Sequence, residues 1–304
     1  MTNLTASLAG ISGVHVTAYG VDGEIDLAMT ASIVSKIAQA GIHNIVSAGN
    51  TGEFFSLTDD EVARVHEAAI EGAAGHAVVT ASVGRSLREA IHTAKRARTA
   101  GADAIMVHHP RDPFAAPQSQ ADYFIELAEA SELPVVAYVR SDTMGIADLR
   151  RVAEHPNIPG IKYAGHNVNR LSACIRETTD LDTIWICGLA EGWAAPFYAV
   201  GARGFTSGLV NVAPALSLAT WNALEAGDYA KAREIVDQIG TFEELRTRYE
   251  NGTNVTVVKE AMMIMGADVG PVRLPGLPRL EEKDRLTLET LIASWPGDML
   301  VHYR

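Results

Sequence analysis

The sequence predicts an α/β fold, specifically a (β/α)8 TIM barrel with a C-terminal helical extension. Eight short apolar runs alternate with longer amphipathic stretches along most of the chain. No low-complexity segment or long linker interrupts this pattern. The chain has 304 residues, 47% of them hydrophobic, so it can bury a large core. A single α/β barrel often reaches this length, and eight strand–helix units are what such a barrel requires.

Each apolar run predicts one strand of a parallel sheet. The runs are short, rich in Val, Ile or aromatic residues, and punctuated by Gly or Pro. Strands that are covered on both faces have this nearly continuous apolar character instead of a strict alternation. The predicted strands span residues 13–19, 42–49, 77–84, 102–109, 133–140, 158–164, 183–188 and 202–208.

Helix start and stop signals lie between these runs. The predicted helices at 27–40 and 86–100 are each followed directly by a glycine, which commonly ends a helix. The segment Thr58–Glu61 has the spacing of a capping box, in which the first and fourth residues satisfy each other's backbone N–H groups. These signals predict that a helix lies between one predicted strand and the next.

The barrel is predicted to occupy residues 1–226, and residues 227–304 form a helical extension packed on it as part of one structural unit. A segment rich in Pro and Gly interrupts the helical pattern of this extension. Its predicted helices span 229–249, 255–265 and 281–294, with the break at 270–278.

Composition excludes several classes of protein. The 25 basic and 37 acidic residues give a net charge of −12, which disfavours nucleic-acid and anionic-membrane partners. Cys174 and Cys187 lie outside any CxxC or Cys/His cluster, so a disulfide framework and a zinc site are not expected. No apolar stretch approaches the ~18 residues of a membrane span, and the first residues lack the pattern of a signal peptide. We expect a cytoplasmic protein.

Lys162 is the first candidate for chemistry. It is the one lysine of six that falls inside an apolar strand run, on the same face as Gly160 and Ala164. The other five occupy helical patterns, where a solvated lysine is expected. A lysine inside a barrel loses hydration, which lowers its pKa, and a neutral amine can attack a ketone to form a Schiff base. The alternative is a buried lysine that pairs with a carboxylate for structural reasons.

A glycine-bracketed loop follows the second predicted strand. This loop, residues 49–57, directly precedes a helix and contains Asn50, Thr51 and Gly52, so its backbone N–H groups and side-chain donors can bind a carboxylate. The alternative is an ordinary turn between a strand and a helix. The loop has neither the G-x-G-x-x-G pattern nor a P-loop lysine, which disfavours nucleotide binding.

Tyr138 is a third candidate, since it shares the inward face of the fifth predicted strand with Val136 and Arg140. A phenol near a Schiff base can carry protons to and from the carbinolamine or the substrate. The alternative is packing alone, because aromatic residues favour strands.

Taken together, these segments resemble the dihydrodipicolinate synthase / N-acetylneuraminate lyase family of class I aldolases. The matching pieces cover nearly the whole chain: VTAYGVDGEID (16–26), GNTGE (49–53), the AYV segment around Tyr138, GIKYAG (160–165) and GARGFTSGLVNVAP (201–214). The resemblance implies that Lys162 is the Schiff-base lysine and that the barrel assembles as a homotetramer. It also implies a 2-oxo acid substrate and neither a metal nor an organic cofactor. Ser207, in the last of these segments, is a further candidate for contact with the substrate.

Three departures separate the chain from the lysine-biosynthetic synthases of this family. Asn50 occupies the position of a threonine that relays protons to the tyrosine. The segment VHHPRDPF (107–114) lacks the tyrosine pair of those enzymes. Thr143 replaces an arginine expected to bind the substrate's carboxylate. The lysine-biosynthetic reaction is therefore disfavoured.

The segment TGEFFSL (51–57) instead resembles the 5-dehydro-4-deoxyglucarate dehydratases. Arg140 matches their arginine, whereas Tyr163 replaces an acidic residue. Arg140 is a candidate to bind a substrate carboxylate in bidentate fashion, the alternative being a structural salt bridge at the barrel rim. His108 and His109 are candidates to contact polyol hydroxyls or to act as an acid, the alternative being that they shape a loop.

The sequence thus predicts a Schiff-base lyase, and the first interpretation is a keto-deoxy sugar acid dehydratase. Alternatives are a pyruvate-dependent aldolase or hydratase-aldolase and a condensation like that of dihydrodipicolinate synthase. A protein of another class, which binds a 2-oxo acid without catalysis, is the third alternative. It would have no need of a desolvated amine.

Overall fold

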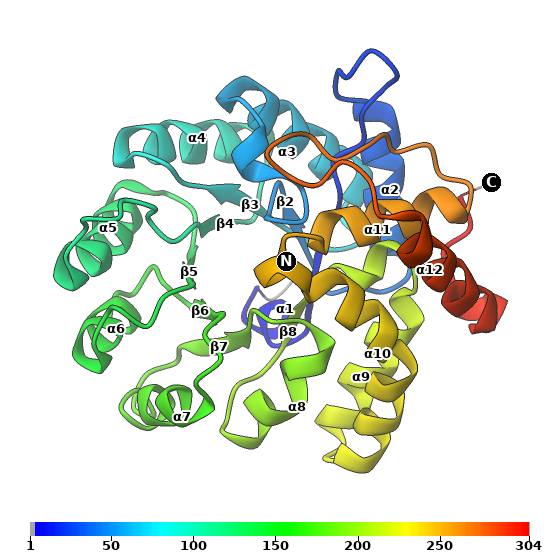
Figure 1. The fold of residues 1–304 in the computed structure, drawn as a ribbon. Coiled ribbons are helices and arrows are strands. Elements are labelled where there is room, and N and C mark those ends of the chain that lie inside the picture. Colours follow the sequence, from blue (N-terminus) through cyan, green and yellow to red (C-terminus); the bar gives the residue numbers. More distant parts are fainter. Residues whose placement is uncertain (1–3, 304) are drawn as a thin grey trace.

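The computed structural model describes residues 4–303, which fold into the predicted barrel (Figure 1). Eight parallel strands close in chain order, each paired with the next, and the last pairs with the first. The (β/α)8 prediction is confirmed. The strands are β1 (Ile11–Val14), β2 (Asn44–Ser47), β3 (Val78–Val83), β4 (Ala104–Val107), β5 (Val135–Val139), β6 (Gly160–Tyr163), β7 (Ile184–Cys187) and β8 (Phe205–Ser207).

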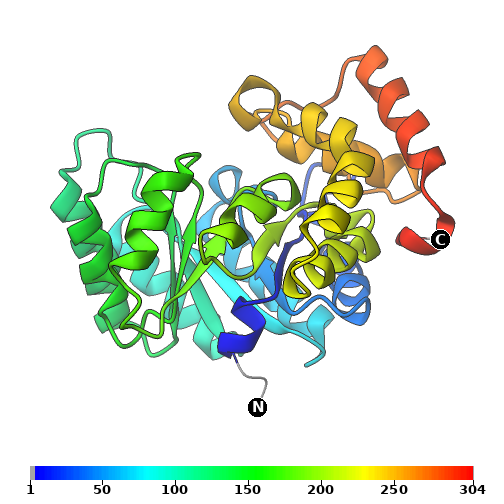
Figure 2. The same ribbon diagram turned by 90° about the horizontal axis from the view of Figure 1, so that it is seen from below.

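Helices surround the strands and bury the apolar outer face of the sheet. The ring consists of α2 (Leu27–Gln39), α3 (Asp59–Ala73), α4 (Leu87–Ala100), α5 (Pro117–Ala130), α6 (Ile146–Ala153), α7 (Val168–Arg176), α8 (Glu191–Ala199) and α9 (Pro214–Glu225). Single-turn helices follow β2 and β8, η1 (Phe54–Ser56) and η2 (Leu209–Asn211). A short helix that the sequence pattern did not indicate, α1 (Leu4–Leu8), lies beneath the barrel (Figure 2).

The local signals for helix ends are confirmed. Thr58 and Glu61 form the expected capping box at the start of α3. Gly101 ends α4 with a φ of 101°, a left-handed conformation that glycine adopts without steric cost.

The first strand is shorter than predicted. It spans Ile11–Val14, whereas the predicted strand spans 13–19, so it begins two residues earlier and ends five residues earlier. Beyond Val14 the backbone binds a side chain instead of a neighbouring strand: Asn211 accepts from the N–H of Val16 and donates to the carbonyl of Val14. An apolar run therefore overestimates the strand where a buried amide takes over its hydrogen bonds.

The barrel interior follows the predicted strand parity. Tyr138 on β5 lies directly opposite Lys162 on β6. Tyr138 and Ala164 belong to the inner apolar cluster, in which Leu8 of α1 also lies. Inward-facing positions of the two strands are thereby brought to the same level of the barrel.

The chain beyond α9 packs on the barrel near the carboxyl ends of the strands (Figure 2). Helical geometry breaks at Arg248–Glu250, near the C-terminal end of α10. Within residues 4–303, no helix is long and apolar enough to cross a membrane. The predicted barrel begins at residue 1 and the predicted extension ends at residue 304. Residues 1–3 and 304 lie outside the described residues. The helices are α10 (Tyr229–Asn251), α11 (Asn254–Ile264) and α12 (Glu282–Ser294), followed by the short η3 (Gly297–Met299).

Candidate active site

A cavity of about 310 Å³ lies at the carboxyl ends of the strands. In barrels of this type the loops at this end carry the chemistry. The structure brings Asn50, Thr51, Tyr138, Arg140 and Lys162 together on the cavity wall. Residues from α10, α11 and the segment that follows them close its outer side.

Lys162 is almost completely buried, with 4% of its surface exposed. Its Nζ lies 4.0 Å from the sulfur of Met106 and 3.8 Å from the centroid of the Tyr138 ring. Within residues 4–303, Lys162 forms no ion pair with a carboxylate, although Lys231 and Lys259 do. Burial, reinforced by the charge of Arg140, lowers the pKa of Lys162 to about 7. A large share of this amine is therefore neutral near pH 7.

Lys259 of α11 is a second buried lysine, and the expectation that it is solvated is wrong. It is 1% exposed, and its Nζ lies 2.7 Å from Oε1 of Glu53. Burial lowers the pKa of Lys259 to about 8, while Glu53 acts in the opposite direction. The helical pattern did not reveal this because α11 is covered on nearly all sides. The carboxylate partner makes Lys259 a structural ammonium, whereas Lys162 has no such partner within residues 4–303.

Tyr138 meets the loop after β2 through its hydroxyl group. The amide nitrogen of Asn50 donates a hydrogen bond to the phenol oxygen at 3.1 Å. Burial raises the pKa of Tyr138, and both the charge of Arg140 and the bond from Asn50 oppose this effect. The Tyr138 hydroxyl is therefore held by a donor, which leaves its own proton available to the cavity.

The backbone of the GNTGE loop is fixed from several directions. Gly52 packs so closely that a Cβ there would lie 3.0 Å from the Cα of Ala48, which explains the glycine. Thr17 donates to the carbonyl oxygen of Gly52 at 2.8 Å. Glu53 adopts a left-handed conformation with a φ of 63°, and its carboxylate accepts from the N–H of Arg273 at 2.8 Å. This rigid turn holds Thr51 at the cavity wall.

Two arginines face the cavity without a carboxylate partner in the part of the chain that the structure describes. Arg140 follows β5, and Arg111 lies in the loop after β4. The guanidinium carbon of Arg111 lies 3.4 Å from the centroid of the Phe55 ring. Burial and the charge of Arg140 lower the pKa of Arg111. The salt-bridge alternative for Arg140 therefore finds no partner in residues 4–303, and Arg111 is a site residue that sequence reasoning missed.

His108 is not among the described residues that line the cavity. It is 2% exposed and stacks on Phe54 with the ring centroids 4.3 Å apart. Burial, followed by the charge of Lys162, lowers its pKa well below the usual range, so the ring is neutral. The centroid of its ring lies 5.6 Å from that of Tyr138, so His108 packs next to a residue that lines the cavity. His109 is half-buried, and burial together with Arg140 lowers its pKa to about 4.

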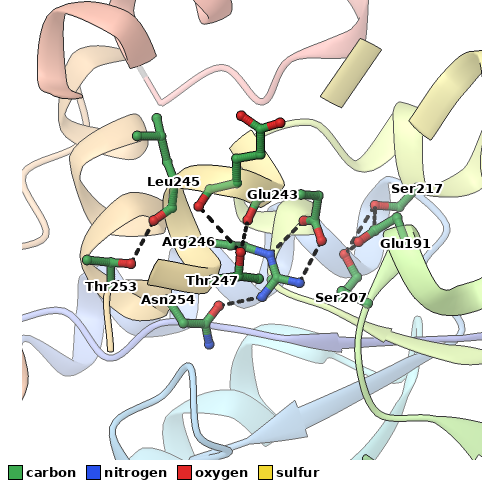
Figure 3. Close-up of polar contacts among 12 residues, drawn as sticks. Glu191, Ser207, Ser217, Glu243, Leu245, Arg246, Thr247, Thr253 and Asn254 are labelled. Carbon is green, nitrogen blue, oxygen red and sulfur yellow. Dashed lines mark hydrogen bonds and ion pairs between the residues drawn. The ribbon is translucent and has the colours of Figure 1, made fainter. Parts of the chain in front are cut away.

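Ser207 lines the cavity, but its hydroxyl points into a buried polar network (Figure 3). It donates to Oε1 of Glu191 at 2.6 Å, as does the hydroxyl of Ser217. Burial, followed by the charge of Glu243, raises the pKa of Glu191 to about 7. The Ser207 hydroxyl therefore donates its hydrogen bond to Glu191 in the protein interior and not into the cavity.

The C-terminal helices contribute Arg246 to the cavity wall. Its guanidinium donates to both carboxylate oxygens of Glu243, at 2.6 and 2.8 Å, and to Asn254 at 2.7 Å (Figure 3). Sequence reasoning missed this residue because an arginine in a helical pattern is ordinarily a surface residue. Its placement depends on how the extension packs.

The family match makes this chain a lyase of the class I aldolase type, built on a (β/α)8 barrel. Residues 7–294 match the model of the "Dihydrodipicolinate synthetase family", and the chain belongs to that family. The resemblance stated from the motifs is confirmed.

Two relatives and one solved structure illustrate the range of similar proteins. A 4-hydroxy-tetrahydrodipicolinate synthase of Haloarcula marismortui is 30% identical, covering 94% of this chain and 93% of its own. A probable 5-dehydro-4-deoxyglucarate dehydratase of Streptomyces avermitilis is 34% identical, covering 88% of this chain and 81% of its own. The crystal structure of dihydrodipicolinate synthase from Bacillus clausii superposes with a TM-score of 0.93 at 34% identity, covering 96% and 99% of the two chains.

Proposed function

We propose that the protein is a keto-deoxy sugar acid dehydratase in which Lys162 forms a Schiff base with the C2 ketone of the substrate. The observation that carries this proposal is the environment of Lys162: a buried amine without a carboxylate partner in residues 4–303, 3.8 Å from the Tyr138 ring. A lysine that merely stabilised the fold would be paired, as Lys259 is.

The loop after β2 would bind the C1 carboxylate. Asn50 and Thr51 line the cavity with Lys162, whereas Gly52 lies between Thr51 and Glu53 in the same turn without lining it. A rigid turn of N–H donors suits a carboxylate. Holding this group places the adjacent ketone at the amine, and such orientation contributes several kcal/mol, with about 7–11 kcal/mol as the ceiling.

In the proposed reaction, Tyr138 donates and accepts the protons while Lys162 forms the covalent bond to the substrate. The neutral amine of Lys162 adds to C2, and the resulting carbinolamine loses water with a proton from Tyr138, leaving an iminium ion and a phenolate. The phenolate removes a proton from C3 to give the enamine. The enamine then expels the C4 hydroxyl group, which leaves as water with the proton that Tyr138 returns, and an unsaturated iminium ion remains on Lys162. Water hydrolyses this iminium, which releases the product and the neutral amine and returns a proton to the Tyr138 phenolate.

The two arginines support a substrate with an acidic group at its far end. Arg111 and Arg140 face the cavity without a carboxylate partner in residues 4–303, so an anionic ligand would satisfy both. A keto-deoxy sugar diacid has this form. The relative from Streptomyces avermitilis that is named as a dehydratase of 5-dehydro-4-deoxyglucarate agrees with this class.

The principal alternative is an aldolase that cleaves the C3–C4 bond and releases pyruvate, since it shares the first step. The relative named as a 4-hydroxy-tetrahydrodipicolinate synthase makes condensation a further alternative. At the position where that reaction expects an arginine, Thr143 has only a hydroxyl, which donates to Gln120 at 2.9 Å. A binding protein without catalysis would leave the desolvated Lys162 unexplained.

Product analysis tests the proposal. The purified native protein is incubated with a keto-deoxy sugar diacid and, separately, with the matching monoacid. The Lys162→Met protein is incubated with the same two substrates as the control. We expect loss of water from the diacid, faster than from the monoacid. Release of free pyruvate would transfer the assignment to the aldolase, and turnover by the Lys162→Met protein would refute the Schiff base. We also propose a homotetramer, which light scattering at defined protein concentration tests.

A further inference from the structure

The hydrogen bond between Asn50 and Tyr138 has a direction that matters for chemistry. The amide nitrogen of Asn50 donates to the phenol oxygen at 3.1 Å. An amide N–H stabilises a phenolate, but it gives up no proton to it and accepts none from it. A hydroxyl group at this position would do both.

No polar chain continues behind Asn50 in the described residues. Its other side-chain atom, Oδ1, is buried and without a hydrogen-bond partner among residues 4–303. A proton on Tyr138 therefore cannot be transferred further through the side-chain amide of Asn50.

The remaining neighbours of Tyr138 do not offer another exit. The His108 ring lies 5.6 Å away, centroid to centroid, and its Nε2 is buried without a partner in the described part of the chain. Arg111 and Arg140, from the segments after β4 and β5, are cations and accept no proton. Lys162, across the ring face, is the amine that the substrate occupies.

We propose that Asn50 is a positioning residue that stabilises the Tyr138 phenolate and closes the proton path behind it, so that Tyr138 returns to the substrate the proton it took from it. This inference rests on the proposed function, because it assigns Tyr138 the proton transfers described there. The proton removed from C3 stays on the phenol oxygen while substrate covers the cavity. It then leaves with the C4 hydroxyl group as water, and no proton is exchanged with solvent between the two steps.

The experiment uses pyruvate, which forms the imine and the enamine but has no C4 to lose. Trideuterated pyruvate labelled with ¹⁸O at C2 is incubated with the enzyme in ordinary water. Loss of ¹⁸O reports imine formation and hydrolysis, and loss of methyl deuterium reports protons that reached solvent. We expect the native protein to lose ¹⁸O much faster than deuterium, because the phenol returns the deuteron.

Two variants separate the two roles of Asn50. Asn50→Thr supplies a hydroxyl that both donates and accepts a proton, and its shorter side chain leaves room for a water molecule behind it to continue the relay. We expect the ratio of deuterium loss to ¹⁸O loss to rise about tenfold or more. Asn50→Leu removes the donor, and we expect deuterium loss to slow about ten- to hundredfold, the size of one hydrogen bond to a charged group. Its pH profile should also move to higher pH. Asn222→Thr, the same change on the exposed face of α9, is the matched control.

Two results overturn the inference. One is equal loss of deuterium and ¹⁸O in the native protein, which requires no variant to fold. The other is an unchanged ratio in Asn50→Thr protein that still forms the imine. Absence of any imine in the native protein would instead refute the proposed function itself, so the two failures are distinguishable.

Discussion

Replacing Lys162 by methionine is expected to make the protein more stable while it abolishes the chemistry. Burial and Arg140 lower the pKa of Lys162 from 10.5 to about 7. At about 1.36 kcal/mol per pH unit, this shift costs the folded state roughly 4 kcal/mol at pH 7 as an upper limit. Methionine has a similar length and no charge, so we expect the free energy of unfolding to rise by about 2–4 kcal/mol.

The pH dependence follows from the sign of the shift. Because the folded-state pKa lies below the unfolded one, the destabilisation is fully present below pH 7. It declines as the pH rises from about 7 toward 10.5. The gain from Lys162→Met should therefore be large at pH 7 and small at pH 10. Denaturant titrations at both pH values, at equal protein concentration, measure this difference.

Lys259→Met is the matched control, with the opposite expected sign. It leaves the Glu53 carboxylate buried without the ammonium that lies 2.7 Å away, which costs about 3–5 kcal/mol. A lower free energy of unfolding for Lys162→Met at pH 7 would contradict a destabilising Lys162. An equal gain in the free energy of unfolding at pH 7 and at pH 10 would contradict it as well.

Three further predictions concern the site. The rate of imine formation with pyruvate should rise with pH around a value near 7, the pKa of Lys162, and a stopped-flow rate that rises only near pH 10 would contradict the account. Arg111→Gln and Arg140→Gln should each raise KM for a sugar diacid by about tenfold to a hundredfold, while KM for the monoacid changes little; equal losses for both substrates would argue against an anion site. Gly52→Ala should weaken binding of the C1 carboxylate, because a Cβ would lie 3.0 Å from Ala48, and isothermal titration with pyruvate would show unchanged affinity if the loop plays no such role.

The barrel and its central lysine could be predicted from sequence because both depend on local, periodic signals. Strand parity alone placed Tyr138 and Lys162 on the inner face, and the register of β5 and β6 sets them opposite each other. Strand length was less predictable. β1 stops at Val14 because Asn211, distant in sequence, takes its next hydrogen bonds.

The rest of the site depends on packing between distant segments. Lys259 and Arg246 occupy helical patterns that ordinarily place such residues in solvent, and only the docking of α10 and α11 buries them. Arg111 gave no signal beyond its charge, since its orientation is set by a loop. His108 was a reasonable candidate for contact with substrate, but Phe54 and Phe55 cover it.

Borohydride reduction in the presence of pyruvate tests the central claim most directly. Reduction converts an imine into a stable secondary amine, and peptide mass spectrometry then locates the adduct. We expect one stoichiometric adduct on Lys162 and none on Lys259, although both lysines are buried. An adduct on Lys259, or none on either lysine with pyruvate and with a longer 2-oxo acid, would contradict it.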